Sequence, residues 1–154
     1  MKITNMVSRL GSNLSPFSVL TPVLFLSFFV STSAFANSVT YVDNCDATVL
    51  SSYAGQTFVV TNDIVKENSG SCIVINHDNV SVDCQDYRLT GIGDTSGFTG
   101  VFVSGSENVS VQNCEFYSWT AGIRFYFDSD YGVAVNNKFR FNDSGIIVFY
   151  SDHA

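Results

Sequence analysis

The chain has 154 residues, of which 45% are hydrophobic and only 14% are charged, and its formal net charge at pH 7 is −7. An acidic chain repels polyanions, so this charge argues against a nucleic-acid-binding protein, in which Lys and Arg neutralise phosphates. It argues equally against the unaided binding of an acidic polysaccharide. Neutral glycans, or anionic glycans bridged by a divalent cation, stay open as ligands.

The first 36 residues have the three parts of an export signal. Lys2 and Arg9 form a basic start, residues 19–30 form an apolar core too short to span a bilayer, and residues 34–36 (Ala-Phe-Ala) form a cleavage site. We predict cleavage after Ala36 and export to the periplasm, the cell surface or the medium, with an uncleaved anchor as the alternative. Removal of this leader leaves five basic and 14 acidic side chains, a net charge of −9.

All four cysteines follow the predicted cleavage site, in a part of the chain that would reach an oxidising environment where disulfides persist. Four cysteines permit three complete pairings, and the sequence does not choose among them. Their spacing contains no Cys-x-x-Cys and no nearby histidine pair, so a zinc site is not expected. We predict a disulfide between Cys45 and Cys72, which would fasten the N-terminal segment to the first repeat. Cys84 and Cys114 are interpreted as buried thiols.

Two short phrases recur in the same order along the rest of the chain. The first is Cys72-Ile-Val-Ile, then Gly100-Val-Phe-Val, Gly122-Ile-Arg-Phe and Gly145-Ile-Ile-Val; the second is Asn79-Val-Ser-Val, then Asn108-Val-Ser-Val and Gly132-Val-Ala-Val. Both alternate apolar and other residues, which predicts strands with one buried face. The side chains predicted to point inward are Ile73, Ile75, Val101, Val103, Ile123, Phe125, Ile146 and Val148 in the first phrase, and Val80, Val82, Val109, Val111, Val133 and Val135 in the second.

A third strand is predicted after each second phrase, around Leu89, Phe116 and Phe139. Three short strands and three turns fill a repeat of this length, and stacked equivalent strands pair the backbone of one repeat with the next. We therefore predict an all-β, single-stranded parallel β-solenoid of four to five coils, without helices. Leucine-rich repeats need several leucines per unit, and a sandwich of hairpins would not repeat the same phrases, so neither alternative is preferred.

One recurrent corner of the predicted coils carries polar side chains. Aligning the second phrases puts Cys84, Asn113 and Asn137 at this corner. An inward amide there would bond the backbone of adjacent coils, because a buried amide needs partners.

The segments Cys72 to Cys84 and Asn108 to Cys114, with the Gly-apolar-x-apolar strands, resemble the right-handed parallel β-helix superfamily with the pectin-lyase-like fold. The resemblance covers about residues 57–152. It extends to the repeat class of carbohydrate-binding proteins, sugar hydrolases and NosD-like periplasmic proteins, and it implies a right-handed β-helix rather than one activity. The expected divisions of the chain are a signal peptide at 1–36, an N-terminal cap and entry coil at 37–64, and the coils at 65–154.

The catalytic patterns of that superfamily are incomplete in this chain. The Gly-His-Gly and Arg-x-Lys of polygalacturonase-like hydrolases do not occur, and Arg124 is the one basic residue at an outward strand position for lyase-like elimination. Asp152-His153 lacks the proline of the epimerase pattern, and His77 is interpreted as a solvated turn residue. We therefore predict a protein without complete catalytic machinery.

Aromatic residues in the turns around the fourth coil form the candidate carbohydrate-binding site, because flat rings with polar tips stack on sugar faces. The candidate set is Tyr117, Trp119, Arg124, Tyr126 and Tyr131. The alternative is that these rings cover the edges of the coil or stack on one another. Asp128 and Asp130 share a turn and have the oxygen ligands that calcium uses, with a solvated acidic turn as the alternative. No other cofactor is predicted.

These observations predict a secreted, periplasmic or cell-surface β-helix protein that binds a polysaccharide, a surface glycan or another surface partner without turnover. It is not expected to bind nucleic acid or to be an integral membrane protein after leader cleavage. The alternatives are a structural adhesin module and the N-terminal part of a larger polysaccharide lyase, hydrolase or epimerase with further coils beyond Ala154. The strand at Gly145 starts a coil that the chain does not finish, so we expect truncation there or self-association through the open solenoid end.

Overall fold

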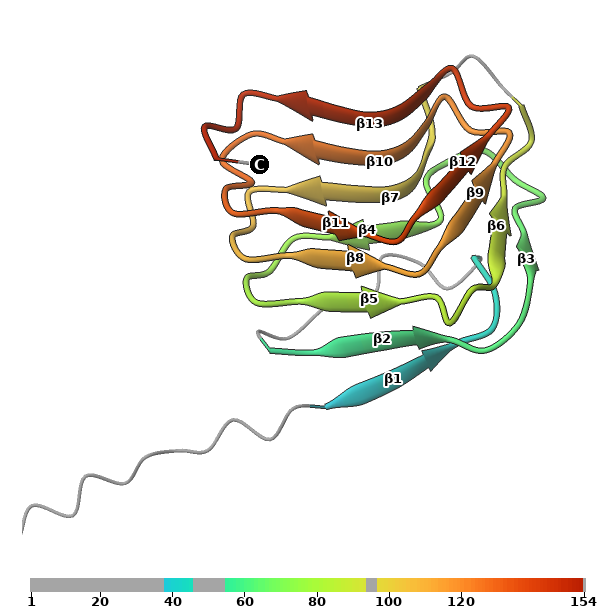
Figure 1. The fold of residues 1–154 in the computed structure, drawn as a ribbon, viewed down its shortest axis with the longest axis horizontal. Coiled ribbons are helices and arrows are strands. Elements are labelled where there is room, and N and C mark those ends of the chain that lie inside the picture. The colour runs from blue at the N-terminus through green and yellow to red at the C-terminus, as the bar shows by residue number, and fades with distance from the viewer. Residues whose placement is uncertain (1–37, 46–54, 94–96, 154) are drawn as a thin grey trace, which may run out of the picture. The chain divides into compact units, whose positions relative to one another are not determined.

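The computed structural model describes residues 38–45, 55–93 and 97–153, and their regular structure consists of thirteen short strands in three sheets (Figure 1). Sheet A holds, in order, β1 (Val39–Val42), β2 (Thr57–Val60), β5 (Ser81–Asp83), β8 (Ser110–Gln112) and β11 (Val133–Val135). Sheet B holds β3 (Ile64–Val65), β6 (Arg88–Thr90), β9 (Glu115–Tyr117) and β12 (Lys138–Arg140). Sheet C holds β4 (Ile73–Ile75), β7 (Thr99–Ser104), β10 (Ala121–Tyr126) and β13 (Ser144–Phe149).

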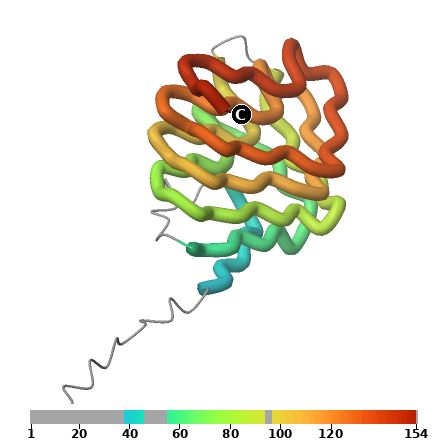
Figure 2. The backbone as a smooth tube through the Cα atoms, turned by 60° about the vertical axis from the view of Figure 1, so that its left-hand side comes forward, coloured from blue at the N-terminus to red at the C-terminus, as the bar shows by residue number. Residues whose placement is uncertain are grey.

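The chain visits the three sheets in turn, and each circuit adds one parallel strand to each sheet (Figures 1 and 2). This arrangement is the predicted parallel β-helix, with about four coils, and it confirms the fold class expected from the repeats. The predicted leader at residues 1–36 lies outside the described residues. Among the residues that are described, no helix has the length and hydropathy needed to cross a membrane.

The interior is filled by matching apolar side chains from successive coils. In sheet C, Val101 lies between Ile73 and Ile123, and in sheet A, Val82 lies beside Val111. All of these side chains are buried, as predicted from the alternation of the two phrases. Stacking in register removes apolar surface from water while it completes the backbone hydrogen bonds between coils. The inward positions predicted for residues 73–125 are confirmed: Ile73, Ile75, Val80, Val82, Val101, Val103, Val109, Val111, Ile123 and Phe125 are all buried.

The last repeat of the second phrase is shifted by one residue from the predicted alignment. Ala134, and not Val133 or Val135, pairs with the buried Val111. Val133 and Val135 are therefore exposed on the outer face of sheet A, and their predicted inward orientation was wrong. The shift arises because Gly132 occupies the inward position, where the ring of Phe125 fills the space that a side chain would need.

The recurring glycines of the first phrase make room for aromatic rings. A Cβ atom on Gly100 would lie 2.3 Å from Cδ1 of Phe116, and one on Gly122 would lie 2.5 Å from Cδ1 of Phe139. Real Cβ atoms do not approach so closely, since contacts at this distance are strongly repulsive. The two rings also stack on each other, with centroids 5.5 Å apart and planes 12° from parallel. Each glycine thus lets the ring of sheet B enter the interior.

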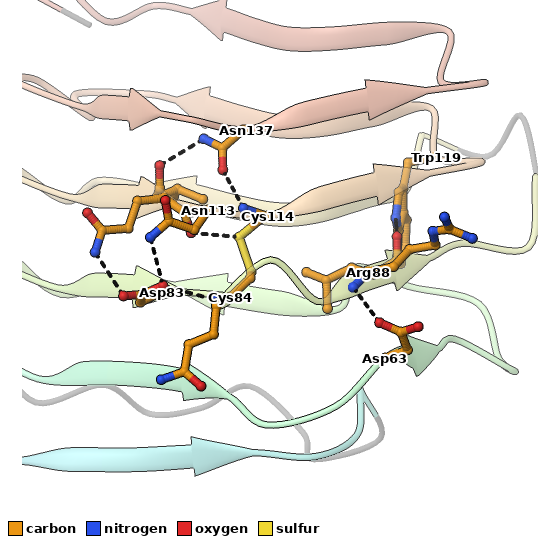
Figure 3. Close-up of a disulfide and its surroundings, with 12 residues drawn as sticks. Asp63, Asp83, Cys84, Arg88, Asn113, Cys114, Trp119 and Asn137 are labelled. Carbon is orange, nitrogen blue, oxygen red and sulfur yellow. Dashed lines mark hydrogen bonds between the residues drawn. A yellow bond between two sulfur atoms is a disulfide. The ribbon is translucent and has the colours of Figure 1, made fainter.

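Inward amides do bond adjacent coils, but at a corner one residue from the predicted one. Asn137 donates to the carbonyl of Val111 over 2.8 Å and accepts from the backbone N–H of Cys114 over 2.9 Å (Figure 3). Asn142 does the same for Phe116 and Trp119. Cys114, rather than Asn113, therefore stands below Asn137. The cause is the one-residue shift of β11, which pairs Val135 with Gln112, because the turns after β8 and β11 have the same length.

Two disulfides join segments of neighbouring coils. Cys45 is bonded to Cys72, with Cα atoms 4.6 Å apart, and Cys84 is bonded to Cys114, with Cα atoms 4.7 Å apart (Figure 3). The interpretation of Cys84 and Cys114 as thiols was wrong. Their sequence separation of 30 residues is one circuit of the helix, so the stacking itself brings the two side chains together. By chain entropy, each bridge contributes about 3–4 kcal/mol to the free energy of unfolding.

The last described coil leaves its inward side chains uncovered. Ile146 and Val148 pair with Ile123 and Phe125 of the coil below, so they face the interior direction as predicted. Ile146 is nevertheless 43% exposed and Val148 is 46% exposed, because no described strand stacks above β13. The exposed Ile146 and Val148 thus occupy the positions that form the core in the coils below.

Candidate binding face on sheet C

The outer face of sheet C carries an unusual set of side chains for a solvated surface. The register places Val74, Phe102, Arg124 and Ile147 in one outward row, and Ser104, Tyr126 and Phe149 in the next. Side chains alternate across a strand, so the same pattern that buries Ile123 and Phe125 turns Arg124 and Tyr126 outward. Phe102, Tyr126 and Ile147 therefore lie next to Arg124, the basic residue of this face.

The aromatic residues of this face contact one another from coil to coil along the helix axis. The centroids of Phe102 and Tyr126 are 5.9 Å apart, and those of Tyr126 and Phe149 are 5.5 Å apart with planes 8° from parallel. The stacking of Tyr126 on Phe149 follows from the coil repeat of about 4.8 Å, which sets equivalent side chains at stacking distance, whereas Phe102 lies diagonally to Tyr126, in the row of Arg124.

A hollow of about 260 Å³ lies on this face, lined by Arg124, Tyr126, Ile147 and Phe149. The Nε atom of Arg124 is buried, and it has no hydrogen-bond partner in the described part of the chain. A buried donor without an acceptor costs roughly 1–3 kcal/mol, and more when it is charged. The hollow therefore combines apolar walls with an arginine whose Nε–H has no acceptor among the described residues.

The structure brings only two of the five predicted binding residues together at the hollow, namely Arg124 and Tyr126. Tyr117 lies on the outer face of sheet B, where the Arg88 guanidinium sits 5.3 Å from its ring centroid. Trp119 is 4% exposed, and its indole N–H donates to the carbonyl of Leu89 over 2.8 Å. Its ring is thus inside the fold.

Tyr131 lies in the turn between sheets C and A, away from the residues that line the hollow. Its ring stacks on that of His153 one coil above, with centroids 5.3 Å apart. A second turn pair, Phe127 and Tyr150, stacks in the same way at 5.2 Å. These pairs match the alternative considered for the aromatic residues, in which rings stack on one another between coils.

Sequence reasoning missed Ile147 and Phe149, which complete the hollow. Both follow β10 by one repeat, since Ile147 pairs with Arg124 and Phe149 pairs with Tyr126. The signal was present in the repeat, because residues at equivalent outward positions of successive coils must be neighbours.

The predicted calcium ligands lie in a turn that is bonded to the next coil. The Asp130 carboxylate accepts the backbone N–H of Asp152 over 2.9 Å, and the backbone N–H of Asp128 donates to the carbonyl of Tyr150 over 3.0 Å. No group of three or more His, Cys, Asp or Glu side chains suited to a metal ion occurs among the described residues. Calcium binding at Asp128 and Asp130 stays a prediction.

The carboxylate of Asp83, on the outer face of sheet A, accepts several hydrogen bonds (Figure 3). It accepts hydrogen bonds from the backbone N–H of Gln85 at 2.9 Å and from the side-chain amides of Gln112 and Asn113 at 3.0 and 3.1 Å. Partial burial alone would raise the pKa of this carboxyl, but the three donors outweigh burial and lower the pKa below its usual range. This arrangement joins two coils and holds a fixed negative charge.

The paired basic and acidic residues of sheet B form a separate charged cluster. Glu115 accepts from both Arg88 and Arg140 at 3.0 Å, and Lys138 lies 3.1 Å from Asp86. These groups are partly exposed, so each pair contributes at most about 1 kcal/mol. The basic side chains of sheet B are thus matched by acids, unlike Arg124 on sheet C.

Comparison with known proteins places the chain in a family. No curated protein and no solved structure gives a significant match. Residues 31–154, most of the chain, match the sequence model of the family described as "Periplasmic copper-binding protein (NosD)". A periplasmic location agrees with the export predicted from the leader. The chain therefore belongs to the NosD family of periplasmic β-helix proteins.

Proposed function

We propose that this protein is a non-catalytic binding module that holds a neutral glycan against the outer face of sheet C. The observation that carries the proposal is the hollow formed by Arg124, Tyr126, Ile147 and Phe149, together with the buried Nε of Arg124, which lacks a partner among the described residues. A surface partner other than a glycan would also have to provide a hydrogen-bond acceptor for Arg124 and an apolar surface for the walls of the hollow.

The chemistry of a sugar ring suits both parts of the hollow. Its C–H face packs against aromatic and aliphatic side chains, here Tyr126, Ile147 and Phe149. Its hydroxyl oxygens accept hydrogen bonds from a guanidinium, which presents several donors in one plane. The hollow is smaller than the roughly 300–1,000 Å³ typical of pockets for drug-sized molecules. It therefore fits one sugar unit of a longer chain, with neighbouring units extending over the exposed sheet.

The electrostatics favour a neutral ligand over a polyanion. After the predicted cleavage the chain carries nine more acidic than basic side chains. Arg88 and Arg140 are each 3.0 Å from Glu115, so they are matched within the fold. Arg124 alone would face a repeating anionic ligand at the hollow, with no second described cation lining it. A neutral ligand avoids repulsion by the remaining acidic surface.

The described residues do not fit the copper that the family description implies. Copper in proteins favours thiolate, thioether and imidazole ligands. All four cysteines are in disulfides, and the two methionines of the chain, Met1 and Met6, are in the predicted leader. His77 and His153 lie in turns that follow β4 and β13, three coil steps or roughly 14 Å apart along the stack. No copper chemistry is therefore assigned to this chain.

A screen of the exported form, starting at Asn37, against immobilised neutral and acidic glycans tests the proposal. We expect retention of a neutral glycan and at least a 10-fold loss of affinity in Arg124→Ala, because a hydrogen bond to a charged donor contributes about 1.5–3 kcal/mol. Arg88→Ala removes an equal charge from sheet B and should bind normally. Absence of any retained glycan, or equal loss in both variants, would overturn the proposal.

A further inference from the structure

The outer face of sheet C is narrow across its strands and long along the helix axis. Arg124 and Tyr126 are the outward side chains of β10, since Gly122 has no side chain and the strand ends at Tyr126. Neighbouring outward positions on one strand are about 7 Å apart, because a strand rises about 3.3 Å per residue. Along the axis, the strands from β4 to β13 span three coil steps, or about 14 Å. A linear ligand therefore finds more surface along the axis than across the strands.

The apolar surface of the hollow continues onto the neighbouring coils. Phe102 of β7 pairs with Arg124, and Val74 of β4 pairs with Phe102, so these side chains lie in one row. Ser104 of β7 lies in the next row, beside Phe102 and paired with Tyr126. Val74, Phe102 and Ser104 are half-buried, and no charged residue occurs within β4 or β7. A ligand at the hollow thus meets further uncharged surface in the direction of β7 and β4.

The ring of Phe102 adjoins the hollow through Tyr126. The centroids of these two rings are 5.9 Å apart, and their planes are tilted by 37°. Tyr126 lines the hollow, whereas Phe102 stands one coil away from Arg124. The two rings therefore provide one aromatic surface that crosses from β10 to β7.

We propose that the ligand of this face is an extended neutral glycan of the cellulose type, which lies along the helix axis with one sugar unit at the hollow and the next on Phe102. The inference rests on the function proposed above. It adds the type of linkage, the direction of the ligand and a second binding residue.

The straight course of the rows favours an extended glycan over a helical one. The residues of sheet C pair directly from coil to coil, and Figure 1 shows β4, β7, β10 and β13 stacked one above another. A cellulose-type chain is extended, because both bonds that join each ring to its neighbours are equatorial. A starch-type chain winds into a helix, because one of these bonds is axial, so it curves away from a straight row. The extended chain alone keeps its contact with successive coils.

Arg124 and Phe102 have different roles in this arrangement. The Nε–H of Arg124 donates to an oxygen of the sugar unit at the hollow, and every ligand has that unit. Phe102 has no polar atom, so it packs against the C–H face of the next unit. Loss of Arg124 should weaken the binding of glycans of every length. Loss of Phe102 should weaken only those long enough to reach β7.

Calorimetric titration of the exported form with cello-oligosaccharides, from the monosaccharide to the hexasaccharide, tests the inference. We expect the affinity to rise by about 10-fold once the chain is long enough to cover Phe102, because a second aromatic contact is made. Malto-oligosaccharides of the same lengths have the same units with starch-type links. They should show no such rise.

A pair of aromatic truncations assigns the rise to Phe102. In Phe102→Ala the affinity for the hexasaccharide should fall by about 10-fold, while the affinity for the monosaccharide stays unchanged. Tyr117→Ala is the matched control, since Tyr117 is an outward aromatic residue of sheet B and its loss should preserve the rise. Circular dichroism verifies that both variants fold.

The outcomes separate this inference from the function on which it rests. Equal binding of the two oligosaccharide series, or equal effects of Phe102→Ala and Tyr117→Ala, would overturn the inference and leave a neutral glycan as the ligand. Absence of binding to cello-oligosaccharides would overturn the inference alone if the glycan screen retains another neutral glycan. It would overturn both proposals if the screen retains none.

Discussion

The ring of Phe116 lies against Gly100, whose missing side chain leaves space where a Cβ atom would come within 2.3 Å of the ring. The same relationship joins Phe139 to Gly122 one coil later. Glycine therefore recurs in the first phrase because of packing from sheet B, and both glycines have a backbone φ outside the left-handed region.

Gly100→Ala should lower the free energy of unfolding by about 1–3 kcal/mol, because the added methyl group overlaps a buried ring and displaces backbone. Urea denaturation followed by circular dichroism measures the loss. Gly145→Ala is the matched control, since its Cβ would lie 3.2 Å from Phe139 at the uncovered end. Equal loss in the two variants would show that the ring contact is not the cause.

Removal of the buried bridge by Cys84→Ser with Cys114→Ser should cost about 3–4 kcal/mol of stability. The bridge spans 30 residues, and both side chains are buried in the stack. Alkylation of the unfolded but unreduced native chain, followed by mass spectrometry, should leave all four cysteines unmodified. Detection of two alkylated cysteines at positions 84 and 114 would contradict this pairing.

Asp83 should make stability depend on pH in the acid range. Its folded pKa is lowered by the donors that it accepts from, so its contribution is present above about pH 4 and is lost as pH falls through the folded pKa. Because Asp83 is mostly solvated, screening keeps the effect at about 1 kcal/mol or less. Asp83→Asn should flatten the acid limb of the stability curve relative to Asp143→Asn. An unchanged limb would contradict the role of the hydrogen-bonded carboxylate.

Copper affinity should depend on the disulfides. With both bridges intact, the exported chain offers no thiolate, so a competing Cu(I) indicator should keep the metal. Reduction frees four thiols and should raise Cu(I) binding sharply. A variant with all four cysteines replaced by serine should lose that increase. Strong binding by the oxidised chain would show that the donor set described above is incomplete.

The sequence predicted the fold well because each coil repeats the chemistry of the one before. Alternating residues such as Ile73 and Ile123 had to face inward, and the structure confirms this. The prediction from the repeat was wrong where the local geometry of one coil differs from that of its neighbours. Gly132 took an inward position and shifted Val133 outward, and the longer turn after β5 hid the alignment that brings Cys84 to Cys114.

The candidate site was harder to predict because it depends on neighbours in space. Trp119 looked like a surface aromatic, but Gly91 leaves a space that its ring fills, with Cδ2 only 2.7 Å from where a Cβ would be. Phe149 looked like part of a terminal strand, and only the register with Tyr126 places it at the hollow. Arg124 was selected from its outward position, and its unpartnered Nε became evident only in three dimensions.

The most direct test of the central claim is a titration of isotope-labelled protein with the retained neutral glycan, followed by amide and side-chain NMR shifts. The account predicts that saturable shifts concentrate at Arg124, Tyr126, Ile147 and Phe149, and that Arg124→Ala abolishes them while the fold is retained. Shifts centred on Tyr117 and sheet B, or no saturable shifts at all, would contradict a glycan-binding face on sheet C.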